Sequence, residues 1–305
     1  AYNSLKRPGQ MRAQSYQTIA HGADTIQFFQ LRRSKGACEK FHGAVISHSG
    51  SEETRVFQEC SQLGAELAAL GSQLLGADNP AQVGILFDWD NYWALEYTSG
   101  PSVDLKYCNQ IHQYYRYFYD RHIPVDMVPM DGDFSRYKAI VAPVLYMVKE
   151  GVAEALTAFV EAGGTLITGF MSGIVDQSDN VHLGGYPGPL RKLCGVWAEE
   201  IDALAPEQSN TLKFMDGSQS KCGLLCDILH LEGAQALAVY GEDFYAGAPA
   251  VTKNAYGKGT VYYVGTQPEA QGLDKILDSL TGQGEIHPLI PDRTQLEVTR
   301  RVKDG

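Results

Sequence analysis

The sequence lacks several features that would assign it to common functional classes. It has no CxxC pair, and its six cysteines lie scattered, mostly among apolar residues. It has no recognisable signal peptide and no apolar run near the ~20 residues that span a bilayer. Positive charge is scarce, because 25 Lys and Arg face 36 Asp and Glu, for a net charge of −11. We therefore expect a cytoplasmic protein with reduced thiols and with neither nucleic acid nor a membrane as partner.

One cysteine group has a spacing that could suit a metal. Cys222, Cys226 and His230 follow one another at four-residue steps, and on a helix such a triplet could bind zinc. The residues between them are mostly apolar, which favours buried thiols instead. We expect no metal site and no cofactor.

The length and composition indicate a globular protein. With 305 residues, 44% hydrophobic and 20% charged, the chain can form about two domains. Residues 10–22 have helical periodicity, residues 24–30 are strand-like, and a polar loop with Glu39 and His42 follows. One such helix and strand cannot bury their own apolar faces, so these residues are expected to belong to a larger fold.

A long helix is predicted next, over residues 50–75, with Ser49 and Glu52 as a capping box. The loop 77–80 ends this helix, and a domain boundary is expected there. From residue 83 onward, buried strands alternate with helices, which predicts a doubly wound α/β sheet. The predicted strands are 83–87, 125–129, 139–143, 165–169 and 261–265, and the predicted helices are 103–121, 151–162 and 273–280.

Two further segments are predicted to be strands. Residues 209–265 favour mainly short strands. Residues 296–305 alternate like one amphipathic strand and end on Asp-Gly, a hairpin turn signal.

Three segments could carry chemistry. Residues 169–173 have the outline of a nucleophile elbow, but Met171 occupies the central position and cannot attack a substrate. After the first sheet strand, acidic residues alternate with Trp89 and Trp93. Such a segment could bind a sugar or anchor a subunit interface, and we favour the interface. Glu39 and His42 could bond sugar hydroxyls, although an isolated Glu-x-x-His pair is a weak signal.

Several blocks in order resemble the family 42 glycoside hydrolases, the β-galactosidases, over nearly the whole chain. They are residues 6–9, 20–24, 28–32, 39–44, 85–89, 93–96, 173–176 and 182–188.

The resemblance implies an α/β fold that begins with the end of a TIM barrel and continues into a doubly wound domain. Residues 1–50 would be the last segment of a (β/α)8 barrel, with 24–30 as its eighth strand, and 51–79 a connecting helix. Residues 80–285 would be a class I amidotransferase-like, or flavodoxin-like, trimerisation domain. Residues 286–305 would be the truncated start of a C-terminal β domain. A homotrimer is therefore expected.

The resemblance also implies an activity, hydrolysis of terminal non-reducing β-D-galactosides with retention by two carboxyl groups ~5 Å apart. In the family both catalytic glutamates precede the segment that matches this chain, so we expect no catalytic residue here and no activity of the chain alone. Glu39 and His42 match the family's galactose-contacting pair, and Phe29 matches an aromatic wall residue of that pocket. The alternatives are a non-catalytic α/β interaction module and a divergent amidotransferase-like enzyme.

Overall fold

The computed structural model describes residues 2–281, 286–291 and 296–303. It divides the chain into two compact units, Ala1–Pro80 with Val298–Gly305, and Ala81–Glu297. The first division falls at the end of the loop 77–80, where the sequence predicts a boundary. No helix in the described part of the chain has the length and apolar character that crossing a bilayer requires.

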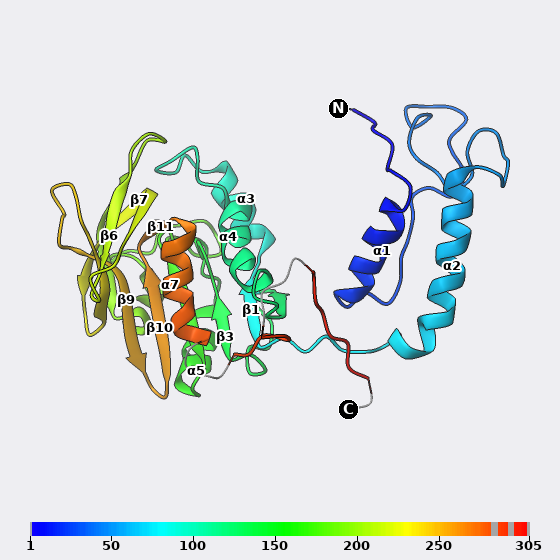
Figure 1. Cartoon of the computed structure of the whole chain (residues 1–305). Coiled ribbons are helices and arrows are strands. Elements are labelled where there is room, and N and C mark those ends of the chain that lie inside the picture. Colours follow the sequence, from blue (N-terminus) through cyan, green and yellow to red (C-terminus); the bar gives the residue numbers. More distant parts are fainter. Residues whose placement is uncertain (1, 282–285, 292–295, 304–305) are drawn as a thin grey trace. The chain divides into compact units, whose positions relative to one another are not determined.

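The first unit contains two helices, α1 (Gln10–Ala20) and α2 (Arg55–Leu74) (Figure 1). Both helices are confirmed, but α2 begins five residues later than expected. The predicted capping box is wrong, because Thr54 is the N-cap residue and its side chain makes no capping hydrogen bond. Ser49 instead pairs its Oγ with that of Ser47 at 2.8 Å. Hydroxyls in a serine-rich segment form such local bonds in competition with helix capping.

The predicted strand at residues 24–30 is not formed. Sheet-like backbone hydrogen bonds begin only at the end of this segment. Val45 N donates to Gln30 O (3.0 Å) and Ile46 N donates to Leu31 O (2.8 Å). A strand exists only when a neighbouring strand satisfies its backbone groups. The described part of this unit provides no such neighbour for residues 24–29.

The predicted strand at 296–305 is also wrong over its described residues. Only Val302 pairs, through two 2.8 Å bonds with Asp78. Beside it the Arg301 guanidinium, with 8% of the side chain exposed, donates to the carbonyls of Leu74 and Ala77 and to Asp24. The tail thus satisfies carbonyls at the end of α2. The hairpin signal at residues 304–305 lies outside the described residues.

The second unit is built on one mixed sheet, and all five predicted sheet strands are confirmed. The parallel strands are β1 (Val83–Leu86), β2 (Val125–Val128), β3 (Ala139–Val141), β4 (Thr165–Gly169) and β10 (Gly259–Val264). They lie in the order β2-β1-β3-β4-β10. All four residues of β1 are buried, as its continuously apolar sequence predicts.

The sheet continues from β10 as an antiparallel half in the order β9-β8-β6-β7-β11, with β5 paired to β7. This half confirms the strands expected over residues 209–265. Its members are β5 (Val196–Ala203), β6 (Asn210–Phe214), β7 (Gln219–Leu231), β8 (Gln235–Tyr240), β9 (Pro249–Tyr256) and β11 (Thr266–Pro268).

Helices cover both faces of this sheet. They are α3 (Trp89–Tyr97), α4 (Tyr107–Tyr119), α5 (Val152–Glu161), the 3-10 turn η1 (Gly188–Leu190), α6 (Arg191–Cys194) and α7 (Ala270–Thr281). The buried side chains of α4 and α7 belong to one apolar cluster and those of α5 and α6 to the other. The three helices expected here are confirmed with shifted ends.

The sheet also buries one carboxylic acid. Asp227 on β7 is 1% exposed, and its Oδ2 accepts a 2.7 Å hydrogen bond from the Tyr263 hydroxyl. Its Oδ1 has no partner among the described residues. Burial raises the pKa of Asp227 to about 7, and the neighbouring Cys226 adds to the rise, while the Tyr263 bond opposes it.

We expect Asp227→Asn to stabilise the second unit increasingly as the pH rises. Below pH ~4 the acid is neutral in both the folded and the unfolded chain, so it contributes no pH dependence. Between about pH 4 and 7 only the unfolded chain is ionised, so stability falls as the pH rises, by up to about 4 kcal/mol. The measurement is the free energy of unfolding of both proteins across this range. A difference that does not change with pH would contradict it.

Candidate functional site

The loop that carries Glu39 and His42 lies in the first unit. Backbone bonds between residues 30–33 and 43–46 hold its two ends together. Within the loop His42 N donates to Glu39 O (3.0 Å), and His42 Nδ1 lies 3.8 Å from Glu39 Oε1. Both side chains are partly exposed. The structure therefore brings the predicted pair together as two neighbouring polar groups that can each bond a hydroxyl.

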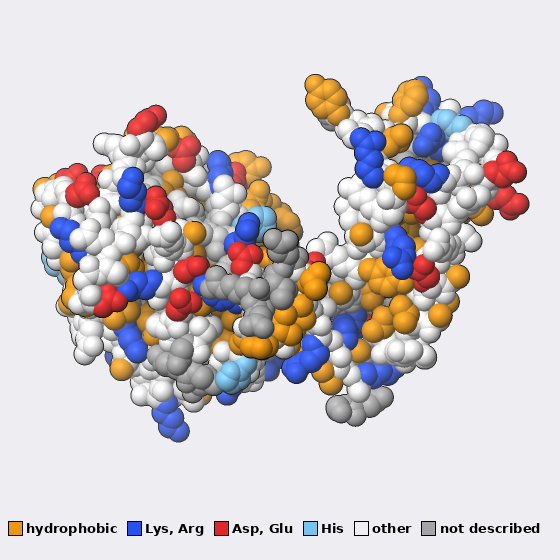
Figure 2. Space-filling model, in the orientation of Figure 1, with side chains coloured by type: hydrophobic (Ala, Val, Ile, Leu, Met, Phe, Trp, Pro, Cys, Tyr) orange, Lys and Arg blue, Asp and Glu red, His pale blue; other side chains and the backbone are white. Residues whose placement is uncertain are grey.

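Phe29 lies beside a hollow of about 330 Å³ in the same unit. Phe29 is 75% exposed, and Phe28, Leu31 and Phe41 are exposed as well. Phe29 lines the hollow with Phe28 and Phe41, whereas Glu39 and His42 do not line it. Figure 2 shows hydrophobic side chains on the surface of this unit. Within the residues that the structure describes, Phe29 therefore does not share a cavity with Glu39 and His42.

In the second unit the residues that follow β1 are held by the loop that follows β3. The Asp88 carboxylate caps α3 by accepting from Asn91 N (2.8 Å). Lys149 Nζ lies 2.7 Å from both Asp88 and Asp90. Carboxyl ends of neighbouring parallel strands meet at one sheet edge, so these charges come together although they are about sixty residues apart in sequence.

Asn91 ties the same two segments together from inside. It is fully buried; its Nδ2 donates to Val144 O (3.2 Å), and its Oδ1 accepts from Met147 N (2.8 Å). Sequence reasoning missed Asn91, because nothing local distinguishes it from an exposed helical asparagine.

Trp89 and Trp93 lie one helical turn apart on α3 and form an aromatic surface. They are 59% and 51% exposed, and their rings are 5.9 Å apart. Behind them Phe87 packs against Trp89 edge to face (5.1 Å) and stacks on Tyr107 (5.5 Å). Two exposed indoles that pack on each other, one of them also against the partly buried Phe87, are typical of an interface anchor.

The segment 169–173 has a sharp turn but no exposed nucleophile. Met171 has a left-handed backbone (φ 56°). The following Ser172 is fully buried, and its Oγ accepts from Thr168 Oγ1 (2.9 Å) and Leu145 N (3.1 Å). The serine is therefore committed to the core, which argues against an amidotransferase-like or hydrolytic reaction at this turn.

The cysteine and histidine triplet does not form a metal site. All three residues lie on β7, a strand and not the helix that zinc binding would need. His230 stacks on Trp197 with ring centroids 4.5 Å apart and pairs with Glu199. Among the described residues no group of three or more potential ligands could hold a metal ion.

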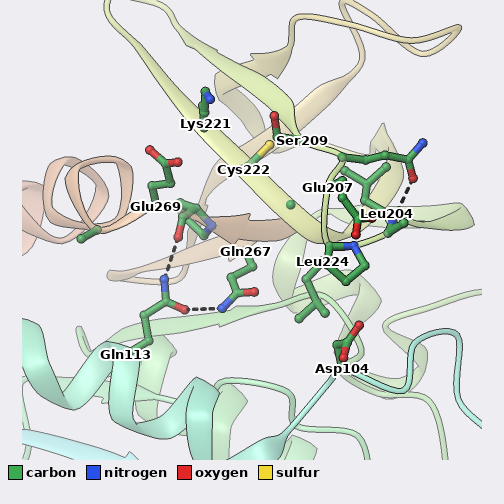
Figure 3. A pocket seen from close by; sticks show the side chains of 16 residues that line it. Asp104, Gln113, Leu204, Glu207, Ser209, Lys221, Cys222, Leu224, Gln267 and Glu269 are labelled. Carbon is green, nitrogen blue, oxygen red and sulfur yellow. Dashed lines mark hydrogen bonds between the residues drawn. The ribbon is translucent and has the colours of Figure 1, made fainter.

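An open cleft of about 690 Å³ was not predicted from the sequence (Figure 3). Gln113 Nε2 on α4 donates to Pro268 O (2.7 Å), and Gln267 Nε2 on β11 donates to Gln113 Oε1 (3.2 Å). Cys222 and Lys221 of β7 contribute to the lining. Its residues come from distant segments that only the sheet register brings together.

Comparison with known proteins covers almost the whole chain. Residues 81–287 match a β-galactosidase trimerisation domain, and residues 1–70 match a β-galactosidase domain. The chain belongs to the family 42 β-galactosidases.

Individual family members agree with this assignment. β-Galactosidase BgaP of Planococcus sp. (strain L4) is 54% identical over 310 residues, covering 100% of this chain and 46% of its own length. β-Galactosidase LacZ of Lactobacillus acidophilus is 49% identical with the same coverage. The crystal structure of a β-galactosidase from Bacillus circulans sp. alkalophilus has a TM-score of 0.94 at 50% identity, over 100% of this chain and 46% of that one. The chain thus spans about half the length of these family 42 relatives.

In this family 42 chain we expect Asn91→Ala to destabilise the second unit by about 2–4 kcal/mol, because the change leaves the buried Met147 amide without a partner and removes one of the two hydrogen bonds to the Val144 carbonyl. Denaturant unfolding followed by fluorescence measures this, since all three tryptophans lie in the second unit. Asn109→Ala, at an exposed position of α4, is the matched control and should change stability by under ~0.5 kcal/mol. Equal effects of the two variants would contradict the role of Asn91.

Proposed function

We propose that the complete protein is a retaining β-galactosidase that hydrolyses terminal non-reducing β-D-galactosides. The observation that carries this is the alignment of the entire chain with β-galactosidases at about half identity. This chain would contribute part of the galactose pocket and the surface for assembly. A cytoplasmic location is part of the proposal.

The domain assignment belongs to the same proposal. The exposed rings of Phe28, Phe29 and Phe41 support residues 1–50 as the last segment of a (β/α)8 barrel, since such rings are normally covered inside a larger fold. Residues 51–79 would connect this barrel segment to the next domain. The strand order β2-β1-β3-β4-β10 is that of a flavodoxin-like sheet, which supports residues 80–285 as the amidotransferase-like trimerisation domain. Residues 286–305 would begin the small β domain.

The proposed galactose contacts are Glu39, His42 and Phe29. The Glu39 carboxylate can accept hydrogen bonds from two adjacent sugar hydroxyls, and the imidazole beside it can donate or accept one. The ring of Phe29 can pack against the apolar face of a pyranose. The acid/base and nucleophile carboxyls of the retaining mechanism would come from residues outside this chain.

We expect Glu39→Gln and His42→Ala, made in the complete protein, to lower kcat/KM for an aryl β-galactoside by about 10- to 100-fold. Glu39→Gln replaces a charged group with two acceptor oxygens by a neutral amide with one, and His42→Ala removes the imidazole bond to the sugar. Lys40→Gln is the control, because Lys40 lies between Glu39 and His42 in the sequence and is exposed. This variant should leave kcat/KM within about twofold of the unsubstituted protein. The chain alone should not turn over this substrate. Measurable turnover by the chain alone, or unchanged kinetics in both variants, would overturn the proposal.

The proposed assembly is a homotrimer whose subunits meet at Trp89 and Trp93. Their two exposed indoles form a preformed apolar contact that costs little side-chain entropy to order, because they pack on each other and Trp89 also packs on Phe87.

We expect the double variant Trp89→Ala and Trp93→Ala to weaken trimer formation by at least tenfold in dissociation constant, because truncating a central aromatic anchor costs about 2 kcal/mol or more. Light scattering over a concentration series measures the assembly state. Phe244→Ala is the control, since this ring is 79% exposed and lies on the segment between β8 and β9. A trimer unaffected by the double variant would place the interface elsewhere.

A further inference from the structure

Two cysteines on β7 are brought close together by an irregularity in the strand. On β11, Thr266 faces Cys226, and the next two residues, Gln267 and Pro268, face Gly223 and Cys222. Two residues of β7, Leu224 and Leu225, therefore lie between the residues that pair with Thr266 and Gln267. One of them, Leu224, has a left-handed backbone (φ 64°), as the extra residues of a bulge often do.

The bulge shortens the distance between Cys222 and Cys226. Four steps along a regular strand span about 13 Å, which no disulfide can bridge. The partners of these cysteines, Thr266 and Pro268, are only two steps apart, or about 6.6 Å. That separation lies within the Cα range of ~4.4–6.8 Å for disulfides.

The register also places both side chains on one face of the strand. Residues two apart on a strand point to the same side, and directly paired residues point the same way. The 3.5 Å contact between Cys226 Sγ and Thr266 Oγ1 agrees with this placement. Both cysteines are buried, yet Cys222 also lines the cleft of Figure 3, from which a small molecule can approach its sulfur.

The two thiols interact with each other. A hydrogen bond from Cys222 lowers the pKa of Cys226 below its ordinary value, and the same bond together with burial raises the pKa of Cys222. One proton is thus held on Cys222 while the sulfur of Cys226 is the more readily ionised, and a thiolate is the form that reacts with oxidants.

We propose that Cys222 and Cys226 are an oxidation site that closes to an intrachain disulfide on exposure to hydrogen peroxide. One thiolate attacks the O–O bond, which gives a sulfenic acid and hydroxide. The second thiolate then displaces hydroxide from the sulfenic sulfur and forms the S–S bond. The two thiol protons convert both hydroxides to water, so that two thiols and one peroxide yield one disulfide and two waters.

The test exposes the folded chain to hydrogen peroxide, blocks the remaining thiols after denaturation, and analyses the tryptic peptide of residues 222–253, which contains both cysteines and no other. We expect this peptide to lose two hydrogen atoms, to resist alkylation, and to be restored by dithiothreitol. The rate should rise in proportion to the peroxide concentration. A rate independent of that concentration would mean that oxidation waits for unfolding, and it would overturn the proposal.

Two single variants complete the test. Cys222→Ser and Cys226→Ser should each abolish the loss of two hydrogens and leave a sulfenic acid that dimedone traps. Exposed Cys38 is the internal reference for oxidant dose, and buried Cys194 is the reference for an isolated thiol. Should the 222–253 peptide remain alkylated at both cysteines once Cys38 is oxidised, the proposal is wrong. That result needs only the unsubstituted chain, so it holds even if a variant fails to fold.

Discussion

The fold of the second unit depends on the pairing of strand β10 with its two neighbours. Strand β10 pairs in parallel with β4 on one side and antiparallel with β9 on the other, and so joins the two halves of the sheet. The parallel side requires a very close approach of main chains. A Cβ on Gly169 would lie 2.2 Å from the carbonyl oxygen of Val264, and one on Gly259 would lie 2.2 Å from that of Val160. Side chains at these two glycines would separate β10 from β4 and α5.

The two candidate surfaces follow from that arrangement. The parallel half collects the ends of β1 and β3 at one edge, where Asn91 and the ion pairs of Lys149 join the start of α3 to the loop after β3. The two tryptophans of α3 remain exposed. The antiparallel half contributes β7, whose bulge against β11 brings Cys222 and Cys226 together beside the cleft. Two different surfaces therefore arise from one continuous sheet.

Sequence patterns predicted the elements that are defined locally. The apolar run that ends at Phe87 and the amphipathic periods of α4 and α5 were sufficient, because burial of those residues does not depend on a particular partner. The predicted strands at 24–30 and 296–305 were wrong because a strand also needs a neighbour to bond. The four-residue steps of Cys222, Cys226 and His230 would suit zinc only on a helix, and these residues lie on a strand, as expected for residues 209–265.

The candidate site was predictable to a similar degree. The closeness of Glu39 and His42 follows from a three-residue spacing within one turn. The tie made by Asn91, the ion pairs of Lys149 and the cleft around Gln113 were not predictable, because each joins segments far apart in the chain. Only the register of the folded sheet specifies those contacts.

The most direct test of the account is a crystal structure of the complete protein with galactose bound. We predict that Glu39 and His42 lie within hydrogen-bonding distance of the sugar hydroxyls, that the Phe29 ring packs against the pyranose, and that both catalytic carboxyls come from residues outside this chain. Galactose bound at a site that none of these three residues touches would contradict it.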